Sequence, residues 1–128
     1  MSSTTTRSIM VVDDEVELAT LFKAFLTKDG YDVMTFVDPV MAFDYFKETS
    51  HKHSLIITDL RMPGMCGLEL AKKIRQVNLD IRIFLMTAFD ISDLKENPDF
   101  NITKIDRIIQ KPVRFSHLRE MINIAWKN

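Results

Sequence analysis

Five short runs of apolar, mostly branched residues recur along the chain and predict β-strands. The runs are Ile9 to Val12, Tyr31 to Phe36, Leu55 to Ile57, Ile81 to Met86 and Arg107 to Ile109. The first, third and fourth are nearly continuous rather than alternating, which is typical of strands buried on both faces of a parallel sheet. We therefore expect helices on both sides of this sheet.

The first two helices are marked by their spacing and their ends. The stripe expected to face the core in the first helix comprises Leu18, Leu21, Phe22, Phe25 and Leu26. Gly30 should end that helix, because glycine is favoured just beyond a helix C-terminus. Asp38 and Pro39 suit the N-cap and first position of the second helix, which turns Ala42, Phe43 and Phe46 inward.

Three further helices follow, of which the fourth is poorly defined. We expect the third over Leu68 to Gln76 and the last over Phe115 to Trp126. The fourth begins at Ile91 and is short, because Pro98 disfavours helix at Asn97. Residues 99–106 lack periodicity and are expected to form an irregular loop. Strands alternating with helices predict an α/β fold, a doubly wound, five-stranded parallel sheet in the order 2-1-3-4-5 flanked by five helices, flavodoxin-like.

Composition narrows the class of protein. The 128 residues suit one domain over residues 8–128, after a disordered N-terminal tail over residues 1–7. Lys plus Arg (17) nearly balance Asp plus Glu (18), which argues against a direct nucleic-acid partner. Cys66 cannot form an internal disulfide, and the chain carries neither an export signal nor a membrane-spanning run. We expect a cytoplasmic protein without a membrane partner.

Candidate chemistry lies directly after the strands. Ligands of such a sheet bind at the carboxyl ends of its strands, and the residues there are Asp13, Asp14, Glu15, Asp59, Thr87, Ala88, Lys111 and Pro112. Clustered carboxylates suit a hard, oxygen-liganded cation such as Mg²⁺. One carboxylate could act as a nucleophile and form an aspartyl phosphate, while Lys111 and Thr87 neutralise the phosphoryl oxygens.

These residues, with the run from Asp59 to Gly67, resemble the receiver domain of two-component response regulators over roughly residues 8 to 127. The resemblance implies that Asp59 is the phosphoacceptor, Asp14 a direct metal ligand and Asp13 a ligand acting through water. It also implies that Arg61 lends its backbone carbonyl to the metal. Thr87 would bond a phosphoryl oxygen, Lys111 would pair with the phosphate, and Pro112 would follow a cis peptide bond.

Several positions depart from the common pattern of this family. Ile108 stands where an aromatic switch residue is usual, so switching should involve Thr87, Ala88 and the segment after them instead of an aromatic flip. The segment from Thr87 to Lys111 has no glycine, and Val113 replaces a common aromatic. The resemblance also implies that Arg61 and Phe89 stand where dephosphorylation is tuned. Neither can accept a proton from water, which favours a long-lived phosphate; the alternative is that both side chains point into solvent or pack elsewhere and leave hydrolysis to the metal and Lys111.

Other polar residues have plainer interpretations. Glu15 fits a first-turn acid of a helix better than a metal ligand. His51, His53 and His117 are expected to be solvated, and Cys66 to be an incidental loop residue.

The leading functional hypothesis is a stand-alone receiver. It would take phosphate from a histidine kinase or phosphotransfer protein, catalyse only its own phosphorylation and dephosphorylation, and bind a downstream protein through the surface around the fourth helix, fifth strand and last helix. Phosphorylation-dependent dimerisation stays open. The alternative is the excised receiver of a longer DNA-binding regulator. A phosphohydrolase with an aspartyl nucleophile is disfavoured, because Arg61 stands where such enzymes carry a second acid.

Overall fold

The structure is a computed structural model that describes residues 7–88 and 91–127. Five parallel strands form one sheet in the order β2-β1-β3-β4-β5. Helices connect successive strands, and a last helix follows β5. The elements are β1 Ser8–Val12, α1 Val16–Lys28, β2 Asp32–Phe36, α2 Pro39–Thr49, the 3₁₀ helix η1 Ser50–Lys52, β3 Leu55–Asp59, α3 Gly67–Val77, β4 Arg82–Thr87, α4 Ile91–Lys95, α5 Pro98–Thr103, β5 Arg107–Gln110 and α6 Phe115–Lys127. The predicted doubly wound α/β fold and strand order are confirmed.

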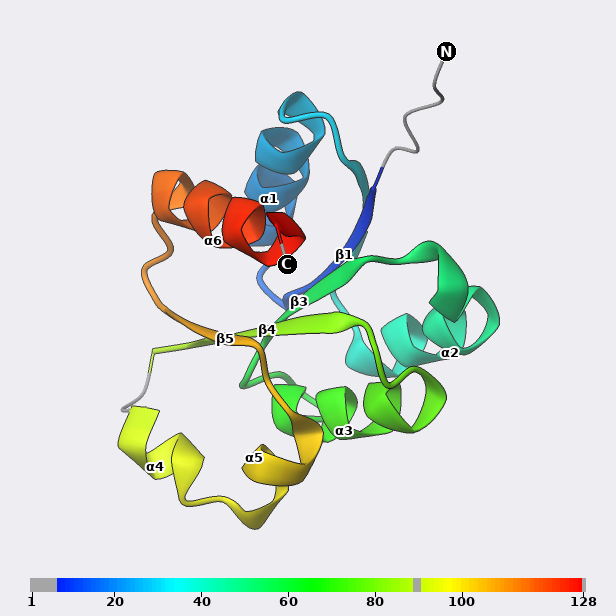
Figure 1. Cartoon of the computed structure of the whole chain (residues 1–128), viewed down its shortest axis with the longest axis vertical. Helices are drawn as coiled ribbons and strands as arrows, with labels where there is room; N and C mark the ends of the chain where they lie inside the picture. Colours follow the sequence, from blue (N-terminus) through cyan, green and yellow to red (C-terminus); the bar gives the residue numbers. More distant parts are fainter. Residues whose placement is uncertain (1–6, 89–90, 128) are drawn as a thin grey trace.

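Helices cover both faces of the sheet (Figure 1). Helices α1 and α6 lie on one face, and α2 and α3 lie on the other, with α4 and α5 beyond α3 next to β5. Side chains of β1 alternate between the two layers: Ile9 and Val11 pack with α1 and α6, whereas Met10 and Val12 pack with α2 and α3. The continuous apolar runs therefore arise because both faces of the central strands are buried.

The ends of the first two helices follow their sequence signals. Asp38 caps α2 by accepting a hydrogen bond from the Val40 N–H at 2.9 Å, and Gly30 follows α1 with a φ of 97°. One member of the α1 stripe was predicted wrongly, because Leu21 is 55% exposed. Phe22 and Leu26 are fully buried, and Leu21 lies about 100° around the helix from Phe22, on the flank of the buried stripe.

The irregular loop expected over residues 99–106 is instead begun by a second short helix. Asn97 adopts an extended conformation, and its side chain accepts a hydrogen bond from the Asp99 N–H at 2.9 Å. Pro98 then occupies the first turn of α5, where its missing N–H costs nothing. Pro98 thus separates α4 from α5: the predicted short fourth helix is present, and a fifth helix occupies most of the expected loop.

His53 was wrongly expected to be solvated, since it is only 7% exposed. Its ring stacks on Phe46 with centroids 5.8 Å apart, while Nδ1 lies 3.3 Å from the Ser8 hydroxyl and Nε2 lies 2.9 Å from the Thr49 hydroxyl. Burial lowers the pKa of His53, an effect that Asp32 partly opposes. The imidazole is thus part of the core at the amino-terminal edge of the sheet.

None of the helices in the described ranges is both long and apolar enough to cross a membrane. Residues 1–6 of the expected tail lie outside the described residues. Arg7 has its carbonyl hydrogen-bonded to the Asp32 N–H at 2.9 Å, and its guanidinium lies 4.3 Å from the centre of the Trp126 ring.

Candidate functional site

The ends of three strands and their following loops meet at one edge of the sheet. The Leu60 N–H donates to the Met86 carbonyl at 2.9 Å, and the Lys111 N–H donates to the Thr87 carbonyl at 2.8 Å. These two backbone bonds continue the sheet by one residue, so the side chains that follow β3, β4 and β5 are held side by side. They enclose a cavity of about 300 Å³ lined by Asp14, Glu15, Asp59, Leu60, Arg61, Thr87, Ala88 and Lys111.

Three carboxylates converge beside this cavity. One oxygen from each of Asp13, Asp14 and Asp59 lies within 4.8 Å of the others. Asp13 is fully buried and Asp59 is 7% exposed. Burial raises the pKa of Asp13, and this is only partly offset by the hydrogen bond from the Glu15 N–H and by Lys111, while Asp59 and Glu15 raise it further.

The buried Asp13 carboxylate has one unused acceptor. Its Oδ1 accepts from the Glu15 N–H at 2.9 Å, but Oδ2 accepts no hydrogen bond from any described residue, although Lys111 Nζ lies 3.5 Å away. A buried carboxylate oxygen without a donor is costly. A cation held by Asp13, Asp14 and Asp59 would relieve that cost, and an all-oxygen ligand set fits Mg²⁺. These residues therefore fit the expected metal.

Lys111 places its ammonium group among these acids. Its Nζ donates to Asp59 Oδ2 at 3.0 Å and to Glu15 Oε1 at 3.3 Å. Burial by itself would lower the pKa of Lys111, but the hydrogen bond to Asp59 and the charges of Asp13 and Asp59 outweigh burial, so the pKa is raised. Glu15 precedes α1 as its N-cap residue, and its contact with Lys111 was not foreseen. The peptide bond between Lys111 and Pro112 is cis, as the resemblance implied.

Glycines shape the loop between Asp59 and α3. Gly64 has a φ of 89°, a conformation that favours glycine. Gly67 donates its N–H to the Leu60 carbonyl at 2.7 Å, and a Cβ at Gly67 would lie 2.0 Å from the carbonyl oxygen of Asp59. Gly67 was not predicted to have a role of its own. Its close approach to Asp59 lets the first turn of α3 pack directly against the backbone at the site.

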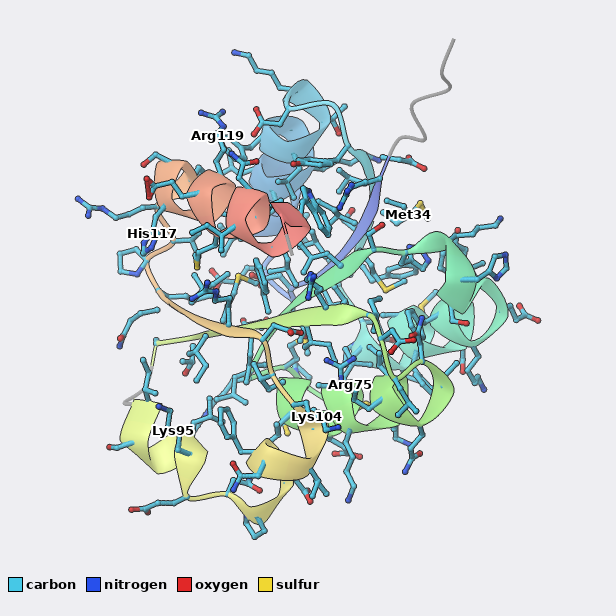
Figure 2. The ribbon with its side chains drawn as sticks, viewed as in Figure 1. Met34, Arg75, Lys95, Lys104, His117 and Arg119 are labelled. Carbon is cyan, nitrogen blue, oxygen red and sulfur yellow. The ribbon has the colours of Figure 1, made fainter. Side chains whose placement is uncertain are left out.

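Not all of the remaining predicted residues line this cavity. Thr87 is 1% exposed and lines the cavity, as do the exposed residues Ala88 and Arg61. Phe89 lies outside the described residues. Ile108 does not line this cavity; it lines a separate groove of about 610 Å³ that α4, β5 and α6 enclose. Lys95 of α4 and His117 of α6 lie on its two sides (Figure 2).

A five-stranded doubly wound sheet with an acid cluster, a threonine and a lysine at its carboxyl edge defines a receiver-type protein. The chain matches the family model of the response regulator receiver domain over residues 9–123. It belongs to this family, whose members act in two-component signal transduction.

Several known proteins are similar to this chain in sequence or in structure. The response regulator receiver protein CpdR of Brucella abortus is 30% identical over 117 residues, 91% of this chain and 92% of that protein. Sporulation initiation phosphotransferase F of Bacillus subtilis is 29% identical, covering 67% of this chain and 68% of that one. The crystal structure of TrrA of Thermotoga maritima, in complex with Mg²⁺ and a beryllium fluoride, is 32% identical with a TM-score of 0.79, covering 92% of this chain and 97% of that one.

Proposed function

We propose that the chain accepts a phosphoryl group on Asp59 in a Mg²⁺-dependent reaction and signals through a surface that changes as a result. The donor is the phosphohistidine of a histidine kinase or phosphotransfer protein. The observation that carries the proposal is the contact between the Asp59 carboxylate and Lys111 Nζ, 3.0 Å apart, beside the unsatisfied buried oxygen of Asp13.

The proposed transfer exchanges one bond to phosphorus for another. A carboxylate oxygen of Asp59 attacks the phosphorus, and the new P–O bond forms as the P–N bond breaks. The electron pair of the broken bond stays on the imidazole nitrogen of the donor. Because the moving group spreads negative charge over its oxygens, groups aimed at those oxygens supply most of the catalysis.

Residues of the chain have separate roles in this proposal. Mg²⁺, held by Asp13, Asp14, Asp59 and the carbonyl of Arg61, supplies positive charge to the site when bound. Lys111 neutralises a phosphoryl oxygen, since its raised pKa keeps it charged. The hydroxyl of Thr87 hydrogen-bonds another oxygen once Asp59 is modified. The chain thus catalyses only its own phosphorylation and dephosphorylation.

The proposal predicts that Asp59 is the sole acceptor. Incubation with acetyl phosphate and Mg²⁺, followed by mass spectrometry, should give one phosphoryl group per chain, and Asp59→Asn should remove it. Asp80→Asn is a matched control, because Asp80 is exposed and precedes β4, whereas the acid cluster lies where the strands end. Labelling of Asp59→Asn at the wild-type level would refute the assignment.

The signal is proposed to travel from Thr87 to the groove between α4, β5 and α6. Movement of the Thr87 hydroxyl toward a phosphate shifts the end of β4, which leads into α4 and the groove that Ile108 lines. Ile108 offers bulk without a hydroxyl, so the proposed two-state element is the position of the chain after Thr87. A downstream protein would read this groove.

We also propose that this receiver acts without an attached output domain. The relation to CpdR, of which the match covers 92%, supports this. The apparent mass of the native protein in an immunoblot tests it, and a band well above the 14.9 kDa of this chain would contradict it.

A further inference from the structure

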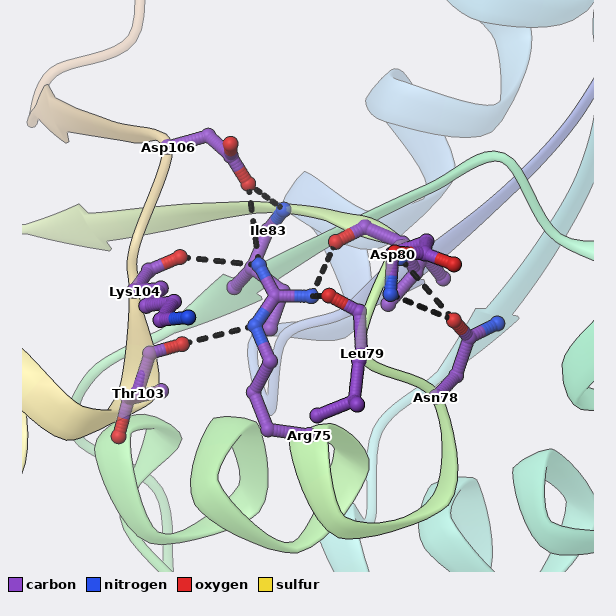
Figure 3. A network of polar contacts seen from close by, with 9 residues as sticks. Arg75, Asn78, Leu79, Asp80, Ile83, Thr103, Lys104 and Asp106 are labelled. Atoms are coloured by element: carbon purple, nitrogen blue, oxygen red, sulfur yellow. Dashed lines mark hydrogen bonds and ion pairs between the residues drawn. The ribbon is translucent and has the colours of Figure 1, made fainter.

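Arg75 of α3 is a buried cation far from the acid cluster. It is 8% exposed, and all five N–H groups of its guanidinium donate hydrogen bonds (Figure 3). One acceptor is the Asp106 carboxylate at 3.3 Å. The other four are backbone carbonyls, those of Leu79 at 3.2 Å, Ile81, Thr103 at 2.8 Å and Lys104 at 2.9 Å.

These acceptors come from two separate parts of the chain. Leu79 and Ile81 belong to the connection from α3 to β4, whereas Thr103 and Lys104 form the end of α5. Lys104 is left-handed, with a φ of 56°. One planar guanidinium therefore joins the end of α5 to α3 and to the start of β4.

Asp106 extends this junction into the sheet. Its Oδ2 accepts from the Ile83 N–H at 2.7 Å as well as from Arg75, and its own N–H donates to the Ile83 carbonyl at 2.9 Å. Thr103 is fully buried, and its hydroxyl donates to the Asp99 carbonyl at 2.6 Å. The start of β5 and the end of α5 are thus attached to β4 at the edge opposite the acid cluster.

Helix α5 packs mainly against α3, whereas helix α4 packs mainly against α5. It spans Ile91–Lys95, and of its described side chains only Leu94 is buried, at 7% exposed. Few buried contacts and a short helix are the features of a segment that moves at low cost in free energy. Helix α4 is also the part of the connection nearest in sequence to Thr87.

We propose that Arg75 is a positioning residue that divides the β4–β5 connection into two halves. The half containing α5 and the start of β5 stays attached to α3, while α4 alone changes position when Asp59 is modified. This inference rests on the proposed function and specifies how its switch is limited. It follows that the wall of the groove formed by α4 moves, while Phe100 of α5 and Ile105, which also line the groove, keep their places.

The attachment depends on the guanidinium fork and not on charge alone. A lysine at this position would carry its three N–H donors on a single nitrogen. It could not donate to four carbonyls that are spread around the guanidinium plane. Arg75→Lys should therefore leave buried carbonyls without donors and free the end of α5. Lys72→Gln is the matched control, because Lys72 pairs with Asp99 across the same two helices at 3.4 Å, but with both side chains 43% exposed.

Hydrogen exchange with and without Mg²⁺ and beryllofluoride tests the proposal. In the wild type, exchange over residues 91–97 should change about tenfold, while residues 98–106 stay within about twofold. In Arg75→Lys, residues 98–106 should exchange about tenfold faster without any ligand, and should respond to beryllofluoride together with residues 91–97. Lys72→Gln should behave as the wild type. Asp106→Asn, which keeps an acceptor oxygen, provides a milder second variant.

The possible failures can be told apart. Equal responses of residues 91–97 and 98–106 in the wild type would overturn the role of Arg75 and leave the proposed switch intact. That role would also be overturned if Arg75→Lys and Asp106→Asn both exchange like the wild type. A wild type that binds beryllofluoride, seen as a rise in Tm, without any change over residues 91–106 would overturn the proposed switch and this inference together.

Discussion

At the scale of single residues, the loop after Asp59 depends on a glycine with no room for a side chain. The first residue of α3, Gly67, approaches the Asp59 backbone so closely that an added Cβ would lie 2.0 Å from the Asp59 carbonyl oxygen. A real Cβ contact is never that short, so the helix and the loop would have to separate. The sequence could not reveal this, because a glycine in the turn that leads into a helix is equally common for conformational reasons.

Gly67→Ala should therefore lower stability and impair phosphorylation together. Overpacking against backbone costs about 2 kcal/mol, and the required shift moves the Asp59 carbonyl and hence the acceptor. Urea unfolding and initial rates with acetyl phosphate measure the two effects. Gly30→Ala is the control, since nothing lies within 4 Å of its added Cβ and only its positive φ is strained. A Gly67→Ala protein phosphorylated at the wild-type rate would contradict this account.

At the scale of elements, the same sequence signal begins two helices, but only one of them could be predicted. Asp38-Pro39 and Asn97-Pro98 both begin helices with a side-chain cap at 2.9 Å. The first pair was interpreted correctly because apolar residues at helical spacing follow it. Helix α5 has six residues, beginning with Pro98, and Thr103 is its only buried side chain, so it is too short for a helical period to appear. The helix is held by tertiary contacts with α3, which no local pattern encodes.

Asn97→Ala should destabilise the protein because the cap of α5 is lost. The cost should be about 1 kcal/mol, which corresponds to a fall in Tm of about 4 °C for a domain of this length. Asp38→Ala removes the equivalent bond from α2 and should cost a similar amount. Thermal melts of both variants measure this. If Asn97→Ala melts at the wild-type temperature, the bond to the Asp99 N–H does not support α5.

At the scale of the whole molecule, buried titratable groups lie at opposite edges of the sheet. The carboxyl edge holds three acids with one unsatisfied buried oxygen, and the amino edge holds the buried His53. The acids were predictable, because topology brings the ends of parallel strands together. The burial of His53 was not predictable, because no local pattern indicates that Ser8 of β1 and Thr49 of α2 meet around its ring.

Millimolar Mg²⁺ should raise the stability of the wild type. At ten times its dissociation constant, a ligand that binds only the folded state adds about 1.4 kcal/mol. A double variant, Asp13→Asn with Asp14→Asn, should show no such rise and should be the more stable protein in EDTA, since repulsion and a buried unpaired oxygen are removed. Melts at constant ionic strength measure both. Equal Mg²⁺-dependent rises in the two proteins would exclude these acids as ligands.

Acid should destabilise the protein through His53. The Thr49 hydroxyl donates to the Tyr45 carbonyl at 2.8 Å, so it accepts from Nε2–H of His53, and Nδ1 is left to accept from the Ser8 hydroxyl. Protonation of Nδ1 would remove that acceptor and place a charge among Phe46 and Tyr45. Burial accordingly holds the pKa of His53 in the folded protein below its ordinary value of 6.5. The charge of Asp32 partly opposes this effect, whereas Lys52 and His51 lower the pKa further.

The direction of the pH dependence follows from this lowered pKa. Between the lowered folded pKa and pH 6.5, the unfolded chain binds the His53 proton and the folded chain does not. The stability that this difference provides is complete above pH 6.5 and is lost as the pH falls through the folded pKa. His53→Gln keeps a donor and an acceptor without a titrating group. The free energy of unfolding in urea should therefore decline less between pH 7.5 and pH 5 in His53→Gln than in the wild type. His117→Gln provides a control for the substitution itself, because His117 is exposed and is not among the groups that act on His53. If the free energy of unfolding changes with pH in the same way in His53→Gln and in the wild type, protonation of the buried imidazole does not destabilise the folded protein.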